Sequence, residues 1–203
     1  MSVHAITDIE RLYNDSNNMY NVTVKKIEKN LRDLEEGIRI LKHWTGGDGN
    51  IQINRLVNAH NDLTKLRNVL TKMSDASSRV AVKYRDNHIA GGGAGKKLSP
   101  IATRIISEQL QKVALTDEDA VQFSDEEAKQ ARDIIEKVRQ NLEKSIPEIN
   151  DACDRVLKNW TSGPGRDEAN KSSKEYIKIM SDYSSVFNEV INKLDQQTAR
   201  YKE

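Results

Sequence analysis

Residues 41–49, LKHWTGGDG, and residues 157–165, LKNWTSGPG, are the two stretches that decide how this chain folds. They align without a gap at an offset of 116 residues, and six of the nine positions are identical. Each holds one of the chain's two tryptophans and at least two glycines, which reach positive φ without a Cβ clash and so end helices. The chain therefore repeats one unit, a turn between two long segments, and this repeat shapes the fold prediction.

The segments on both sides of the first turn carry apolar residues at helical spacing. In the first segment most steps between these residues are three or four, with one interruption near residues 16–18. This heptad pattern predicts two long amphipathic helices that form a helical hairpin. The predicted buried positions are Ile6, Ile9, Tyr13, Tyr20, Val24, Ile27, Leu31, Leu34, Ile38 and Leu41, then Ile53, Leu56, His60, Leu63, Leu66, Leu70, Met73, Ser77, Val80 and Tyr84.

A glycine-rich break begins at Ala90 and separates this hairpin from the second half of the chain. Ser99 and Pro100 then suit the N-cap and first position of a helix, so we predict a connecting helix from Pro100 to Leu115.

A second pair of long helices follows. Thr116 and Ser124 each begin a capping-box pattern, and Pro147 is expected to kink or interrupt the helix after Ser124. The predicted buried positions here are Ala128, Ala131, Ile135, Val138, Leu142, Ile146, Ile149, Cys153, Val156 and Trp160, then Tyr176, Met180, Tyr183, Phe187, Val190, Leu194, Thr198 and Tyr201.

Together these patterns predict an all-α protein, with two tandem long helical hairpins that form a four-helix bundle and an extra linker helix. The predicted domains are the first hairpin at residues 1–90, the glycine-rich linker and connecting helix at residues 91–120, and the second hairpin at residues 121–203. The composition agrees, because 31% charged residues, 36% hydrophobic residues and three prolines suit amphipathic helices better than a thick globular core.

Charge and hydropathy narrow the possible function classes. The 32 Lys and Arg against 31 Asp and Glu leave a net charge of +1, too little to attract nucleic acid or an anionic membrane. No apolar run approaches the roughly 20 residues that cross a bilayer, and the N-terminus does not have the pattern of a Sec signal peptide. We therefore expect no nucleic-acid partner, no membrane insertion and synthesis in the cytoplasm.

Few residues suggest catalysis or metal binding. The single cysteine, Cys153, excludes an internal disulfide and falls at a predicted buried position, so we expect a packed side chain rather than a nucleophile. Residues 90–97 do not match a phosphate-binding loop, and the four histidines have no partner at metal-ligand spacing. The acidic residues at 117–119 and 125–127 suit first helical turns. We predict no enzyme activity, no catalytic or metal site, and no cofactor.

A helical hairpin with Trp-x-Gly at its bend resembles the WXG family, the ESAT-like substrates of type VII secretion systems. The first turn, Trp44-Thr45-Gly46, matches this motif. The second departs from it, with serine at the third position and glycine one residue later. Because the family unit is about half this chain, the resemblance implies a tandem fusion of two WXG units. The turn and recognition residues it implies are Trp44, Thr45, Gly46, Gly47, Gly49, Trp160, Thr161, Ser162, Gly163 and Gly165.

By this resemblance the protein would be a non-enzymatic secreted substrate, or a helper, of a type VII secretion system, exported without a Sec signal peptide. Its partners would be the secretion machinery or a co-secreted helical protein, and a homo-oligomer is compatible with the pattern. Two questions stay open: whether the tryptophans only pack or are also recognised, and whether the chain is instead a cytoplasmic coiled-coil adaptor or scaffold. The Tyr-x-x-x-Asp/Glu export signal of many family members is not found, because Tyr84, Tyr176 and Tyr183 lack an acidic residue four positions later.

Overall fold

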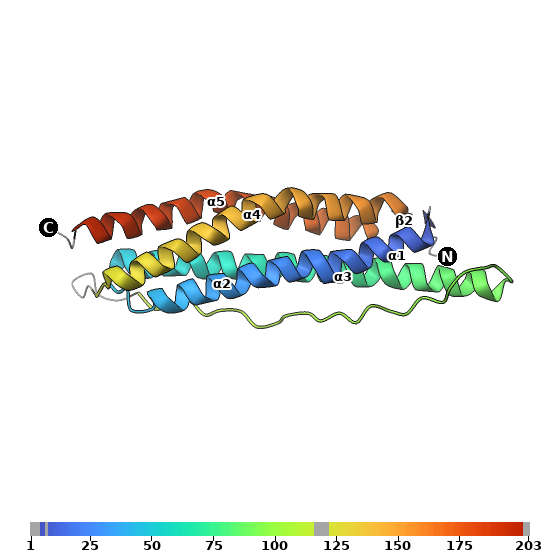
Figure 1. Cartoon of the computed structure of the whole chain (residues 1–203), viewed down its shortest axis with the longest axis horizontal. Helices are drawn as coiled ribbons and strands as arrows, with labels where there is room; N and C mark the ends of the chain where they lie inside the picture. The colour runs from blue at the N-terminus through green and yellow to red at the C-terminus, as the bar shows by residue number, and fades with distance from the viewer. Residues whose placement is uncertain (1–4, 7, 116–121, 201–203) are drawn as a thin grey trace. The chain divides into compact units, whose positions relative to one another are not determined.

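The computed structural model describes residues 5, 6, 8–115 and 122–200, and these form an all-α helical bundle (Figure 1), as the sequence predicts. Two predictions lie outside the described residues. One is the burial of Tyr201, and the other is the capping-box pattern that begins at Thr116. The elements in order are β1 (Ala5–Ile6), α1 (Ile9–Asn18), the π-helix η1 (Met19–Val24), α2 (Lys25–Leu41), α3 (Gly47–Ala90), α4 (Asp125–Asn159), β2 (Trp160–Ser162) and α5 (Arg166–Arg200).

The chain divides into two compact units, and each takes segments from several helices. Unit 1 comprises Met1–Ile27, Lys65–Ser107 and Pro147–Ile177. Unit 2 comprises Glu28–Thr64, Glu108–Ile146 and Lys178–Glu203. The helices α3, α4 and α5 are each divided between the two units, so that one end of each helix belongs to unit 1 and the other end to unit 2. Each unit therefore has its own core. The predicted division into hairpins along the sequence stays a prediction.

Most heptad positions that the sequence predicts are buried. Trp160 and Phe187 are the bulkiest side chains with almost no exposure, in unit 1 and unit 2 respectively. Burying such a side chain stabilises the fold by about 1.5–3 kcal/mol, so these rows of residues hold the helices together. The confirmed positions in α3 are Ile53, Leu56, His60, Leu63, Leu66, Leu70, Met73 and Ser77.

The interruption near residues 16–18 is followed by the π-helix η1 at Met19–Val24. The buried residues before, within and after this helix are Leu12, Ser16, Met19, Val24 and Ile27. The five-residue step from Met19 to Val24 fits a π-helical turn, which holds one residue more than an α-helical turn and so keeps the same face buried.

The prediction that Tyr13 and Tyr20 are buried is wrong, because the buried face runs beside them. Both rings are half-buried and their hydroxyls reach the chain that follows α3. The Tyr13 hydroxyl donates to the carbonyl of Ser99 at 2.6 Å, and the Tyr20 hydroxyl accepts from the N–H of Arg104 at 3.2 Å.

The predicted connecting helix from Pro100 to Leu115 is also wrong. These residues contain no helix, and Figure 1 shows them as a plain trace between α3 and α4. We call residues 99–113 the strap. In unit 2, Asn54 and Asn61 of α3 bind strap residues that are only three apart. Asn54 and Asn61 are seven residues apart, which is about 10.5 Å along a helix. The three-residue step in the strap must span the same distance. Three extended residues can span it, whereas three helical residues would span only about 4.5 Å. The strap is therefore extended.

Pro147 does not interrupt α4, which continues from Asp125 to Asn159. Proline removes the N–H that would bond the carbonyl of Glu143, four residues earlier. Both residues are exposed, so water can satisfy that carbonyl. Within the described part of the chain, none of the helices has an apolar stretch of the length that a membrane crossing requires.

The strap conformation is testable with proline. We expect Gln109→Pro, at an exposed strap position, to change the free energy of unfolding by less than about 0.5 kcal/mol, because proline suits extended backbone. The matched change Lys137→Pro, at an exposed position inside α4, should cost about 3 kcal/mol or more. Urea denaturation measures both. A cost near 3 kcal/mol at residue 109 would show that the strap is helical.

Candidate functional site: two tryptophan turns and an asparagine-bound strap

The first tryptophan turn lies in unit 2 between α2 and α3. Trp44 is 3% exposed, and its backbone N–H donates to the carbonyl of Leu41 at 2.8 Å. Its ring and that of Phe123 form an edge-to-face pair with a centroid distance of 5.8 Å and an interplanar angle of 70°. Thr45 pairs with Gln122, since its N–H donates to the Gln122 carbonyl at 3.0 Å and its hydroxyl accepts from the Gln122 N–H at 2.9 Å. The segment just before α4 thus covers this turn.

Two glycines allow Trp44 to pack in this way. Gly46 has a φ of 97°, which residues with a Cβ rarely adopt. Gly49 lies against the indole, and a Cβ built there would be 2.7 Å from both Trp44 Cδ1 and the Trp44 carbonyl oxygen. Each glycine therefore has a separate physical role, one in chain reversal and the other in ring packing.

The second tryptophan turn lies in unit 1 between α4 and α5. Trp160 has no exposed surface and belongs to β2, which pairs antiparallel with β1 through Ile6 opposite Trp160 and Ala5 opposite Ser162. The Arg166 guanidinium donates to the Trp160 carbonyl, which ties the first residue of α5 to the turn. Among the described residues the buried indole N–H of Trp160 has no hydrogen-bond partner.

The second turn's departure from Trp-x-Gly has a structural reason. Ser162 lies in the extended strand β2, where any side chain fits. The positive φ that the first turn has at Gly46 is shifted to Gly163, at 131°, and appears again at Gly165, at 81°. The strand pairing with β1 uses one more residue before the chain reverses. The two turns therefore bury tryptophan at the same sequence position with different backbone paths.

The surface of the turns differs from their interior. Both indole rings are buried, so a binding partner would meet the residues around them rather than the rings. In the first turn Lys42 and His43 are exposed, and in the second Thr161 and Ser162 are exposed. Of the glycines at the turns, Gly46 and Gly49 are buried whereas Gly165 is exposed.

Sequence reasoning missed the asparagines that bind the strap. In unit 2, Asn54 donates to the Val113 carbonyl at 3.0 Å and accepts from the Val113 N–H at 2.8 Å. Asn61 does the same with Leu110, at 3.1 Å and 3.0 Å. In unit 1, Asn68 pairs with Ile106 at 2.6 Å and 3.0 Å. We call Asn54, Asn61 and Asn68 the asparagine row.

Two further residues of α3 bind the strap in unit 1. Asp75 accepts a long hydrogen bond of 3.5 Å from the Thr103 hydroxyl. The Arg67 guanidinium donates to the carbonyl of Arg104. Asn54, Asn61, Asn68 and Asp75 recur every seven residues, so this spacing was the signal in the sequence that could have revealed the row.

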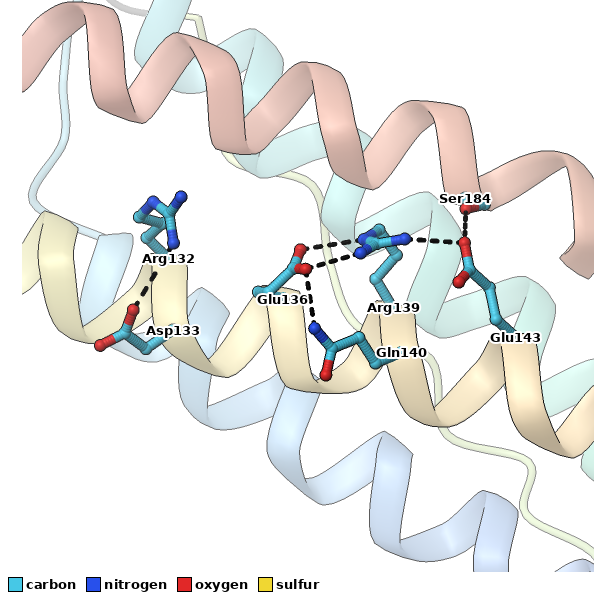
Figure 2. Close-up of polar contacts among 7 residues, drawn as sticks. All are labelled: Arg132, Asp133, Glu136, Arg139, Gln140, Glu143 and Ser184. Carbon is cyan, nitrogen blue, oxygen red and sulfur yellow. Dashed lines mark hydrogen bonds and ion pairs between the residues drawn. The ribbon is translucent and has the colours of Figure 1, made fainter.

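A polar cluster joins α4 and α5 in unit 2. Figure 2 shows the Arg139 guanidinium between Glu136 and Glu143. Its nitrogens lie 2.6 Å from Glu136 Oε1 and 2.7 Å from Glu143 Oε1, and the Ser184 hydroxyl of α5 donates to Glu143 at 2.6 Å. The hydrogen bond from Arg139 lowers the pKa of Glu136 to about 2. Both carboxylates are thus held ionised, which suits a structural clamp and not a general acid.

Two other candidate reactive residues, Cys153 and His60, are packed in the cores. Cys153 is buried as predicted, and burial raises the pKa of its thiol to about 11, far from the range of a reactive thiolate. His60 is buried, with its Nε2 2.7 Å from a Glu35 carboxylate oxygen. Asp125, Glu126 and Glu127 occupy the first turn of α4 beside Ser124, as predicted. Among the described residues, no three His, Cys, Asp or Glu side chains are grouped so that they could hold a metal ion.

Comparisons with protein-family models, with curated proteins and with solved structures found no match.

The fit between Gly49 and Trp44 predicts the effect of one methyl group. Gly49→Ala should destabilise the protein by about 1–3 kcal/mol, because the new Cβ overlaps the indole and the Trp44 carbonyl. Asn58→Ala, at an exposed position of the same helix, should change stability by less than about 0.5 kcal/mol. The free energy of unfolding in urea checks both. An unchanged or raised stability for Gly49→Ala would contradict the packing described for this turn.

The ionised clamp predicts a pH dependence. The pKa of folded Glu136, about 2, lies below its ordinary value of 4.5, so Glu136 stabilises the fold above pH 4.5 and loses this effect as pH falls toward 2. Wild type should therefore be more stable than Glu136→Gln at pH 6, and the difference should vanish near pH 2. Urea denaturation at several pH values measures it. Glu175→Gln, at an exposed position inside α5, controls for the loss of one charge. A difference that does not change with pH would contradict the clamp.

Proposed function

We propose that this protein is a non-enzymatic substrate or helper of a type VII secretion system and acts by protein–protein recognition through its two tryptophan turns. The observation that carries the proposal is the repeated turn, in which Trp44 and Trp160 are both buried at a helix-to-helix bend. A motif kept twice at the same position between long helices supports a role beyond filling the core.

The geometry suggests how such recognition would work. In the first turn the buried indole packs against Gly49, and in the second the β1–β2 pairing holds the backbone around the buried Trp160. The exposed neighbours, such as His43 and Ser162, would then be presented in a fixed arrangement. The tryptophans would act as positioning residues and the exposed turn residues as the contact surface.

The proposal is tested by export. In a bacterium with a type VII system, wild type should appear in the culture fraction, and deletion of the membrane-bound secretion ATPase should abolish its appearance. Ser162→Arg, which changes an exposed turn residue, should reduce export at least about fivefold, the effect of losing about 1 kcal/mol of recognition, with the thermal midpoint unchanged.

The matched control is Lys178→Glu, a charge change at an exposed position of α5 outside both turns, which should leave export as in wild type. Export that persists without the ATPase would contradict the secretion role. A second variant, Trp44→Phe/Trp160→Phe, is compared with Ser162→Arg. If both variants fold and both are exported as well as wild type, the tryptophans have a packing role only.

A second function is favoured by a different observation. The asparagine row shows that α3 binds extended chain through its main-chain groups. This is a chemistry that an adaptor or scaffold protein could use, and it needs no secretion system.

A further inference from the structure

The asparagine row binds main chain and not side chains. Each asparagine amide donates to the carbonyl and accepts from the N–H of the same strap residue. A neighbouring strand offers this same pair of hydrogen bonds in a β-sheet. Since every residue except proline carries both groups, the row would accept an extended segment of almost any sequence.

Most side chains of the strap are exposed. Ile101 is buried, and Ile106, Leu110 and Val113 are half-buried. Ile105 is 42% exposed, although it is next to Ile106, which Asn68 binds. Burial of apolar surface therefore holds the strap at a few positions, and the hydrogen bonds to α3, α1 and η1 supply the other specific contacts.

The strap's own sequence opposes its bound conformation. Ile101, Ile105 and Val113 follow helical spacing, which is why the sequence predicts a helix here. In the extended state these residues gain no helical hydrogen bonds. Of the three, Ile101 is buried, Val113 is half-buried and Ile105 is exposed. A local preference that conflicts with the observed conformation makes the bound state easier to leave.

A glycine-rich stretch joins the strap to α3. The chain between α3 and the strap contains residues 91–95, of which four are glycine, and Gly92 and Gly95 have φ values of 86° and 143°. A glycine-rich tether lets a segment detach and rebind without disturbing the helix before it.

From these observations we propose that Asn54 and Asn61 of α3, both in unit 2, form a binding site for an extended polypeptide segment of another protein, and that the strap is a tethered occupant which such a segment displaces there. The ligand needs an unstructured stretch with two non-proline residues three apart, matching the spacing of Leu110 and Val113. This inference does not rest on the proposed secretion role.

The test uses the full chain with a weakened strap. Leu110→Pro/Val113→Pro removes the two N–H groups that donate to Asn61 and Asn54 and leaves α3 unchanged. The probe is a fluorescein-labelled synthetic peptide with the wild-type sequence of residues 97–115. Fluorescence anisotropy should show saturable binding to this variant that is at least about tenfold tighter than to wild type, whose tethered strap competes at high effective concentration.

Two matched controls make the readout specific. Adding Asn61→Ala to the weakened chain should lower the peptide affinity about tenfold, whereas Asn58→Ala, an exposed asparagine of the same helix, should not change it. A peptide carrying proline at positions 110 and 113 should bind at least about tenfold more weakly. Leu110→Pro alone serves if the double variant does not fold, as judged by circular dichroism.

Three outcomes would overturn the proposal. The first is a folded, strap-weakened chain that does not bind the peptide. The second is binding that Asn61→Ala leaves unchanged. The third is a wild-type chain that sediments as a dimer which Asn61→Ala dissociates, because the occupant would then be the strap of a second copy and not a segment of another protein.

Discussion

The seven-residue repeat of α3 is the constraint on which the other elements depend. Between residues 50 and 80 its exposed positions form a single stripe, and every other position is at least half-buried. One face of the helix therefore packs in the core and another binds the strap, and the residues of each face recur every seven positions. The exposed stripe is Ile51, Asn58, Lys65, Lys72 and Arg79. The core positions at this interval are Leu56, Leu63, Leu70 and Ser77, and the positions that bind the strap are Asn54, Asn61, Asn68 and Asp75.

The two tryptophan turns solve one packing problem with different backbones. Trp44 is fitted against Gly49 and covered by Phe123, whereas Trp160 is held in a strand that pairs with residues 5 and 6. In both, the ring is removed from solvent, so a role in recognition would pass through the exposed residues that the ring positions. The Arg139 cluster adds a polar link between α4 and α5 that is independent of either turn.

The helices and most of their buried faces could be predicted because apolar spacing reports directly on helical periodicity. The serine at the third position of the second motif could be noticed in the sequence but not explained, since the β1–β2 pairing joins residues about 155 apart. The strap was mistaken for a helix because its apolar spacing is helical, and local pattern cannot show that Asn61 on another element will bind its main chain. The five-residue step at η1 likewise misplaced Tyr13 and Tyr20.

The central claim is that asparagine side chains of α3 bind the main chain of an extended strap. Both the corrected fold and the peptide-binding inference rest on this claim. Hydrogen–deuterium exchange, resolved by residue in the wild-type chain, tests it most directly. The amides of Leu110 and Val113 donate to asparagine side chains and should exchange at least about tenfold more slowly than those of Gln109 and Lys112. Continuous protection from residue 103 to residue 115 would indicate a helix, and equal fast exchange at all four amides would show that the asparagines do not hold the strap.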